Sequence, residues 1–347
     1  MKLIKVIVRI LTDFTLDVIM TLQLSPRLGA KLINKLFDHP ETITEPATYK
    51  LAKEKVTVEL DLTYESALKN NTYDFYFPNK IEALVPVLFW VHGGGYVGGD
   101  KLDVREFATR LVADTGIAIV SINYGLAPDS QYPSQLLQLN EMVRHIQNNT
   151  KAYKMLDMTQ VFLGGDSAGA QIALQYAALQ TNNDYARQMN FEQVIPKENL
   201  KGALSYCGPV DLKQQINQPS DNRFMNFFIR TVAWSLIGTK NWHNSKELQE
   251  ASVANHITKD FPPTYVTDGN TFTFPEQGIT LVERLIELKI PVQSLFHTEN
   301  AKQIPHEYQF DFSTEEAKQS YQKTVEFIVT HTPLSISFEG CDYSTLK

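Results

Sequence analysis

The sequence predicts an α/β fold, a doubly wound and mostly parallel central sheet with helices on both faces. Short apolar runs with the length of buried strands recur along the chain, at 86–91, 117–122, 160–164, 201–206, 263–267 and 291–296. Amphipathic stretches lie between or after them, at 103–114, 133–148, 168–180, 275–288 and 314–330. Strands that are apolar throughout and alternate with helices are typical of a parallel sheet covered on both faces.

Two segments before this alternating region have the pattern of half-buried strands. Residues 54–64 and 72–77 alternate apolar and polar side chains, and Lys69-Asn70-Asn71 between them has the composition of a turn. We therefore expect an antiparallel hairpin at one edge of the sheet.

Two further segments break the alternation and predict the domain organisation. Residues 1–45 precede the sheet and have helical character, so we expect an N-terminal helical cap segment. Residues 209–258 separate two strands by more than an ordinary connection and are rich in aromatic side chains, which favours an inserted helical cap. The main domain is then expected at 46–332, followed by a weakly patterned tail at 333–347.

The first 24 residues are apolar enough to resemble a signal peptide or a membrane span. Their polar side chains recur every three or four residues, at Lys2, Lys5, Arg9, Asp13, Asp17 and Thr21. This spacing favours an amphipathic helix that packs on the protein, with a membrane-surface role as the alternative. Charges interrupt any run long enough to span a bilayer, and no small-residue cleavage site follows. We expect a bend after this helix, near Pro26 and Gly29.

Composition excludes several classes of function. Of the 347 residues, 43% are hydrophobic, so the chain can bury a substantial core. The formal net charge is -7, with acidic and basic residues interspersed, which argues against a nucleic-acid partner. Cys207 and Cys341 cannot form a disulfide framework, and no cysteine–histidine cluster suggests zinc. We therefore expect a cytoplasmic protein that needs no metal and no cofactor.

The strongest chemical motif is Gly165-Asp166-Ser167-Ala168-Gly169, which fits the pattern G-x-S-x-G. It follows an apolar strand and opens a helical stretch, and this context distinguishes a nucleophile elbow from a chance match. The flanking glycines are needed because the turn is so sharp that larger side chains would collide. The motif predicts that Ser167 is a nucleophile at a helix N-terminus, where developing negative charge is favoured.

A glycine-rich segment, HGGGYVGGD at 92–100, follows the strand at 86–91. Attack by a serine on an ester carbonyl generates an oxyanion, which preplaced backbone N–H groups stabilise. Glycine lets the backbone approach closely, so we expect Gly94, Gly95 and the N–H of Ala168 to form the oxyanion hole. The segment lacks the Lys-Ser/Thr ending of a phosphate-binding loop.

A serine nucleophile needs a general base, which in the chain order Ser, acid, His should follow the last strand. His306 lies in a loop at a suitable distance beyond the strand at 291–296 and is the predicted base. His297 is nearer to the end of that strand and is the competing candidate. His92 begins the glycine-rich segment and is expected to brace it, without titrating in catalysis.

These motifs resemble those of the hormone-sensitive-lipase-like esterases of the α/β-hydrolase superfamily. The matching pieces are HGGGYVGGD, NYGLAPDSQYP at 123–133, GGDSAG at 164–169, the strand entry Pro262-Pro263 and IPHEYQF at 304–310. They span about residues 55 to 330, in the family's order. The resemblance implies an α/β-hydrolase fold and serine hydrolysis of short- or medium-chain carboxylic esters. It also implies a cap built from N-terminal helices and an insertion after the sixth strand.

The sequence departs from this family at the third catalytic residue. The family usually places its aspartate four residues beyond a strand end, where this chain has Phe272. Asp268 is the first candidate for the acid that orients His306, because functional groups in open α/β sheets lie at the carboxyl ends of strands. Glu276 is the second candidate, and the alternative for Asp268 is a role in an Asp-Gly turn. Gly125 also stands where the family often carries arginine.

The sequence therefore predicts a serine carboxylesterase that hydrolyses a small-molecule ester through an acyl-enzyme intermediate. Two other hypotheses stay open. The missing acid at Phe272 would suit a hydrolase-fold protein that only binds a small apolar ligand, and the N-terminal helix would suit a membrane-surface lipase. Aromatic cap residues are candidates for the entrance, although such residues at helical spacing more often belong to a core: Phe224, Phe227, Phe228 and Trp234.

Overall fold

The computed structural model describes residues 25–37, 46–217, 222–297 and 302–332. The amphipathic helix expected over the first 24 residues and the tail at 333–347 lie outside these ranges. Within the described ranges, no helix is both long and apolar enough to cross a membrane.

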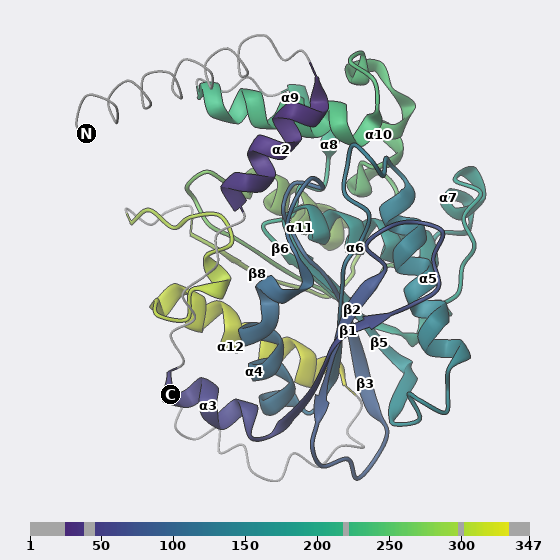
Figure 1. Cartoon of the computed structure of the whole chain (residues 1–347), viewed down its shortest axis with the longest axis vertical. Helices are drawn as coiled ribbons and strands as arrows, with labels where there is room; N and C mark the ends of the chain where they lie inside the picture. Colours follow the sequence, from purple (N-terminus) through teal and green to yellow (C-terminus); the bar gives the residue numbers. More distant parts are fainter. Residues whose placement is uncertain (1–24, 38–45, 218–221, 298–301, 333–347) are drawn as a thin grey trace, which may run out of the picture.

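An eight-stranded sheet in the order β1-β2-β4-β3-β5-β6-β7-β8 forms the centre of the protein (Figure 1). β2 pairs antiparallel with β1 and β4, and the remaining neighbouring strands pair parallel. The structure therefore confirms a mostly parallel sheet with an antiparallel hairpin at one edge. The strands are β1 (Val56–Thr63), β2 (Thr72–Pro78), β3 (Val85–Val91), β4 (Ala118–Ile122), β5 (Leu156–Asp166), β6 (Leu200–Tyr206), β7 (Thr264–Asp268) and β8 (Val292–Phe296).

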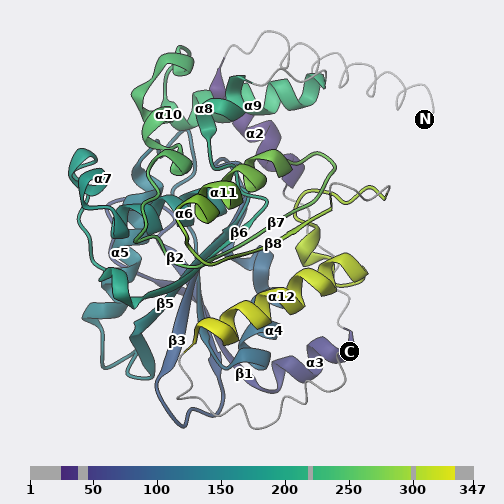
Figure 2. The same ribbon diagram turned by 180° about the vertical axis from the view of Figure 1, so that it is seen from behind.

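Helices cover both faces of the sheet, as Figure 2 shows from behind. One face packs against α4 (Arg105–Thr115) and α12 (Glu315–His331). The other packs against α5 (Ser134–Asn148), α6 (Ala168–Thr181) and α11 (Pro275–Glu287). β3 and β4 are buried along their whole length, which explains why their sequences are apolar without alternation. Shorter elements are α3 (Ala47–Lys53), α7 (Asn183–Gln188), and the 3-10 turns η1 (Lys101–Val104), η2 (Lys197–Asn199) and η5 (Tyr308–Phe310).

The long segment between β6 and β7 is built from short helices. It contains α8 (Leu212–Asn217), α9 (Arg223–Ile237), η3 (Trp242–Asn244), α10 (Lys246–Glu250) and η4 (Val253–Asn255). α2 (Pro26–Phe37) lies beside α9, so segments far apart in the sequence meet at one end of the sheet (Figure 1).

α2 corrects one expectation from the sequence. The bend was expected near Pro26 and Gly29, but α2 begins at Pro26 and continues through Gly29, so no bend lies at Gly29. The helix expected before Pro26 lies outside the described residues. A Cβ atom on Gly29 would lie 2.6 Å from Cγ2 of Thr231 in α9. Gly29 thus allows the two helices to pack closely, while Pro26 takes a first helical position that needs no N–H.

Candidate active site

Ser167 occupies a sharp turn between β5 and α6. Its backbone has φ 50° and ψ -119°, a conformation that is strained for any residue other than glycine. A Cβ atom on Gly165 would lie 2.5 Å from the carbonyl carbon of Gly169, and one on Gly169 would lie 2.0 Å from the oxygen of Val91. Only glycine therefore fits on either side of Ser167, which is the steric requirement of a nucleophile elbow.

The glycine-rich loop after β3 also needs glycine. Gly94 and Gly95 have φ values of 97° and 60°, in the region that side chains disfavour. His92 is buried, stacks on Tyr124 with ring centroids 4.4 Å apart, and has Nδ1 2.8 Å from the oxygen of Gly93. His92 thus braces the loop from beneath, at a distance from the reacting groups.

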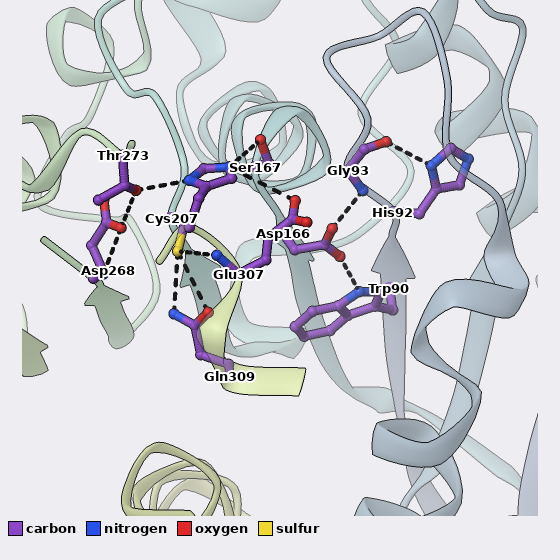
Figure 3. Close-up of polar contacts among 12 residues, drawn as sticks. Trp90, His92, Gly93, Asp166, Ser167, Cys207, Asp268, Thr273, Glu307 and Gln309 are labelled. Atoms are coloured by element: carbon purple, nitrogen blue, oxygen red, sulfur yellow. Dashed lines mark hydrogen bonds and ion pairs between the residues drawn. The ribbon is translucent and has the colours of Figure 1, made fainter. Parts of the chain in front are cut away.

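The glycine-rich loop and the elbow are in direct contact (Figure 3). The N–H of Gly93 donates to Oδ2 of Asp166 at 2.6 Å, and Nε1 of Trp90 donates to Oδ1 at 2.8 Å. Ala168 is the first residue of α6, where backbone N–H groups have no acceptor within the helix. The predicted oxyanion donors therefore come from two segments that lie against each other.

His306 is within hydrogen-bond distance of Ser167. Its Nε2 lies 2.8 Å from Oγ of Ser167, and its backbone N–H donates to the oxygen of Thr271. His297 is engaged elsewhere, because its Nε2 lies 3.0 Å from the hydroxyl of Tyr308. Of the two candidate histidines, the structure brings only His306 to the serine.

The structure corrects how Asp268 reaches the histidine, because Thr273 lies between them (Figure 3). Oδ1 of Asp268 accepts from the Thr273 hydroxyl and from the N–H of Gly269, the latter at 2.7 Å. Oγ1 of Thr273 lies 2.7 Å from Nδ1 of His306. Sequence reasoning missed Thr273, since a threonine that bridges two loops has no sequence pattern of its own.

Phe272 stands at the family's position for the acid, and Glu276 is the second candidate. Both lie away from His306. Phe272 has φ 53°, and 66% of its surface is exposed. Glu276 is exposed in the first turn of α11, and no hydrogen bond or ion pair joins it to His306 in the described part of the chain.

Burial sets the protonation states of the histidine and the aspartate. It lowers the pKa of His306 to about 4, because the imidazolium loses solvation there. It raises the pKa of Asp268 to about 6, although the Thr273 hydroxyl and backbone N–H groups oppose this rise. At neutral pH, His306 is therefore a neutral base and Asp268 is ionised.

A possible metal site in the described residues overlaps this constellation. Ligand atoms of Cys207, Asp268 and His306 lie within 4.8 Å of one another. The Asp268 and His306 atoms hydrogen-bond to Thr273, and Sγ of Cys207 to Gln309. Burial raises the pKa of Cys207 well above its usual value, so its thiol stays protonated and is a poor metal ligand. These residues do not fit a metal centre.

Helices α2 and α9 both contact the glycine-rich loop. A Cβ atom on Gly95 would lie 2.9 Å from Cζ of Phe228 in α9. Nδ2 of Asn34 in α2 donates to the oxygen of Val97 at 3.0 Å. Of the aromatic residues expected near the entrance, Phe227 is buried and Phe224 is exposed, whereas Phe228 reaches the loop.

The backbone at Gly125 leaves no space for the family's arginine. A Cβ atom there would lie 2.2 Å from Oγ of Ser130, and the N–H donates to Oε1 of Gln138 at 2.5 Å. A side chain at this position would therefore require Ser130 to move.

Two proteins of similar sequence are named as an esterase and as a putative alpha/beta hydrolase. An esterase of Gibberella moniliformis is 25% identical over 59% of this chain and 62% of its own length. A putative alpha/beta hydrolase of Acanthamoeba polyphaga mimivirus is 30% identical over 27% of each chain. The chain thus spans less than two thirds of the length of these curated relatives.

Fold and family follow from two further matches. Esterase B of Lactobacillus rhamnosis, inhibited by a tributyrin phosphonate, superimposes with a TM-score of 0.70 at 18% identity, over 88% of this chain and 96% of that one. This likeness establishes the α/β-hydrolase fold expected from the motifs. Residues 73–285, more than half of the chain, match the BD-FAE family model. The chain therefore belongs to the BD-FAE family.

Proposed function

We propose that the protein is a serine carboxylesterase that hydrolyses short- to medium-chain carboxylic esters. The observation that carries this proposal is the 2.8 Å contact between Nε2 of His306 and Oγ of Ser167, beside a glycine-rich loop. The matched proteins of Gibberella moniliformis and Lactobacillus rhamnosis are named esterases, which supports it. The tributyrin phosphonate bound to the second of these favours an ester with short acyl chains.

The proposed reaction begins when Oγ of Ser167 attacks the ester carbonyl and its proton passes to Nε2 of His306. The N–H groups of Gly94, Gly95 and Ala168 stabilise the resulting oxyanion. The His306 imidazolium then gives its proton to the leaving alcohol, which leaves an acyl group on Ser167. Water, deprotonated by His306, releases the acid in a second step.

Thr273 transmits the charge of Asp268 to His306 in this mechanism. In the required tautomer, Nδ1–H of His306 donates to Oγ1 of Thr273, and that hydroxyl donates to Oδ1 of Asp268. Each hydrogen bond polarises the next in a buried chain of this kind. Thr273 is therefore a positioning residue that holds the ring and its tautomer.

We also propose that the N-terminal segment 1–45 and the insertion at 209–258 form a cap over the main domain at 46–332. The contacts of Asn34 and Phe228 with the glycine-rich loop support this arrangement. Phe228 would then contact the bound ester. A cytoplasmic location and the tail at 333–347 stay predictions from the sequence.

The first test is replacement of the nucleophile. Ser167→Ala is expected to lower kcat for p-nitrophenyl butyrate by about a millionfold, because no other group can form the acyl-enzyme. Mass spectrometry should find an organophosphonate on Ser167 of the wild type. Ser313→Ala, at an exposed serine, is the control and should be labelled and active. Undiminished turnover by Ser167→Ala would show that Ser167 is not the nucleophile, whereas a wild type that is neither labelled nor active would favour the non-catalytic ligand-binding protein.

A second test concerns the Thr273 hydroxyl. Thr273→Val keeps the volume but removes the hydrogen bonds, so kcat is expected to fall about 100-fold while KM changes little. Thr273→Ser keeps a hydroxyl and is expected to stay within about tenfold of the wild type. Steady-state kinetics with p-nitrophenyl butyrate measures both variants, and equal losses would show that the hydroxyl is not used.

The third test is the pH dependence on the acid side. As the pH falls, Asp268 takes up a proton near its pKa of about 6, before His306 does so near its pKa of about 4. Asp268 and His306 are therefore expected to contribute two successive falls to kcat/KM of the wild type, near pH 6 and near pH 4. Asp268→Asn should lack the step near 6 and lose about 10- to 100-fold on the plateau, because Thr273 then has an uncharged acceptor. A step near 6 that persists in Asp268→Asn would assign it to another group.

A further inference from the structure

Glu307 lies near the Nε2 atom of His306, with Asp166 beside it, and neither acidic side chain has a role in the mechanism above. Asp166 is the last residue of β5, and Glu307 follows His306 directly in the chain. Oε1 of Glu307 lies 3.8 Å from Nε2 of His306, the atom that receives the serine proton. Figure 3 shows the Asp166 and Glu307 side chains approaching each other beside Gly93.

The two carboxyl groups meet at the space where Gly93 has no side chain. A Cβ atom on Gly93 would lie 2.4 Å from Oδ2 of Asp166 and 2.6 Å from Oε1 of Glu307. The two carboxyl oxygens therefore border the same small space. Two ionised carboxylates in this space would repel each other, so one of the two groups is expected to keep a proton, which it can donate to the other.

The surroundings decide which group keeps the proton. Asp166 accepts one N–H from Gly93 and one from Trp90, and both stabilise its charged form against the cost of burial. Burial and the negative charge of Asp166 raise the pKa of Glu307 well above its usual value. The proton therefore stays on Glu307, which donates it to Asp166, and the pair titrates as a unit.

We propose that Asp166 and Glu307 form a carboxyl pair that shares one proton, and that its single negative charge stabilises the His306 imidazolium from the Nε2 side. This inference rests on the proposed function, because the imidazolium forms only when Ser167 loses its proton. A counter-charge is needed there, since the ring is largely buried and Asp268 acts on it only through Thr273. Glu307 is thus a positioning residue that acts through His306.

Other titratable groups face the pair from the neighbouring elements. They are Asp103 of η1, Asp268 of β7, Cys207 after β6 and Tyr124 beside the glycine-rich loop, and His92 contacts the oxygen of Gly93. Burial raises the pKa of Cys207 and Tyr124 and lowers that of His92, so these three are uncharged around neutral pH. The negative charges of Asp103 and Asp268 help Glu307 to keep its proton.

A double-mutant cycle tests whether the pair supplies one charge. Glu307→Gln and Asp166→Asn each leave one carboxylate, whereas the double variant leaves none. At about pH 8, kcat/KM of the double variant is expected to lie about tenfold below the product of the two single effects, the equivalent of one pKa unit of lost charge stabilisation. A loss equal to that product would mean that the residues act independently and would overturn the proposal. Glu276→Gln, at an exposed site, is the control for loss of a carboxylate.

The pH profile separates a role in charge from a role in structure. Burial shifts the pKa of Asp166 upward, so kcat/KM of the wild type is expected to rise around neutral pH as the pair gains its charge. Glu307→Gln should move this rise to higher pH, because Asp166 keeps its N–H donors but loses the carboxyl hydrogen bond that stabilises its charged form. A variant that is slower at every pH with an unmoved rise would indicate a structural role and contradict the proposal. This single variant keeps the test decisive if Asp166→Asn does not fold.

A stability measurement tests the shared proton without turnover. Carboxyl groups whose pKa is raised by folding stabilise the protein at low pH, and this contribution is lost as the pH rises through the raised pKa. The free energy of urea unfolding should therefore fall between about pH 5 and 8 more steeply in the wild type than in Glu307→Gln. Equal slopes would reject the shared proton. Full activity of Ser167→Ala alongside unequal slopes would reject the proposed function and leave the pair intact.

Discussion

The site depends on the contact between two stretches of main chain that leave no room for side chains. β3 and β5 are parallel neighbours in the sheet, so the loops that follow them start side by side. β4 lies on the other side of β3, so the connections diverge at this point, where α/β sheets bind their ligands. Gly169 against Val91 and Gly93 against Asp166 then close the gap between the loops. Glycine is needed at each of these positions if the Ser167 hydroxyl and the predicted N–H donors are to face the same substrate group.

Burial creates a second requirement, because in the proposed mechanism His306 gains a charge where solvation is poor. Acidic side chains must compensate for the lost solvation, yet carboxylates in the same place also lose their own. The structure separates these groups by hydrogen-bonded intermediates. Thr273 lies between His306 and Asp268, and in our proposal a shared proton lies between Asp166 and Glu307. In both cases, a negative charge stabilises the His306 ring through a hydrogen-bonded group, and no two ionised carboxylates are in contact.

Motifs with a steric cause could be predicted from the sequence, and the structure has them at the predicted residues. Gly165 and Gly169 are required by a turn whose atoms leave no alternative, so the elbow at Ser167 was visible in one pentapeptide. The alternation of apolar strands and amphipathic helices likewise gave the mostly parallel sheet. The role of Gly29 was predicted wrongly, because a sequence does not distinguish a glycine that allows close helix packing from a glycine that allows a bend.

The partners of His306 could not be predicted, because they depend on how two distant loops fold together. A bridge between Thr271 and Pro305 aligns the loop after β7 with the loop that carries the histidine. This pairing directs the Thr273 hydroxyl to Nδ1 and leaves Phe272 exposed, although the family's spacing places the acid at Phe272. Glu307 lies in the IPHEYQF motif at 304–310, but nothing in the sequence places it beside Asp166.

A crystal structure of the phosphonate adduct tests whether these two main-chain segments hold one tetrahedral centre. We expect phosphorus bonded to Oγ of Ser167, with the phosphonyl oxygen accepting hydrogen bonds from the N–H groups of Gly94, Gly95 and Ala168. An adduct on another residue, or a phosphonyl oxygen that points away from the glycine-rich loop, would contradict the proposed oxyanion hole.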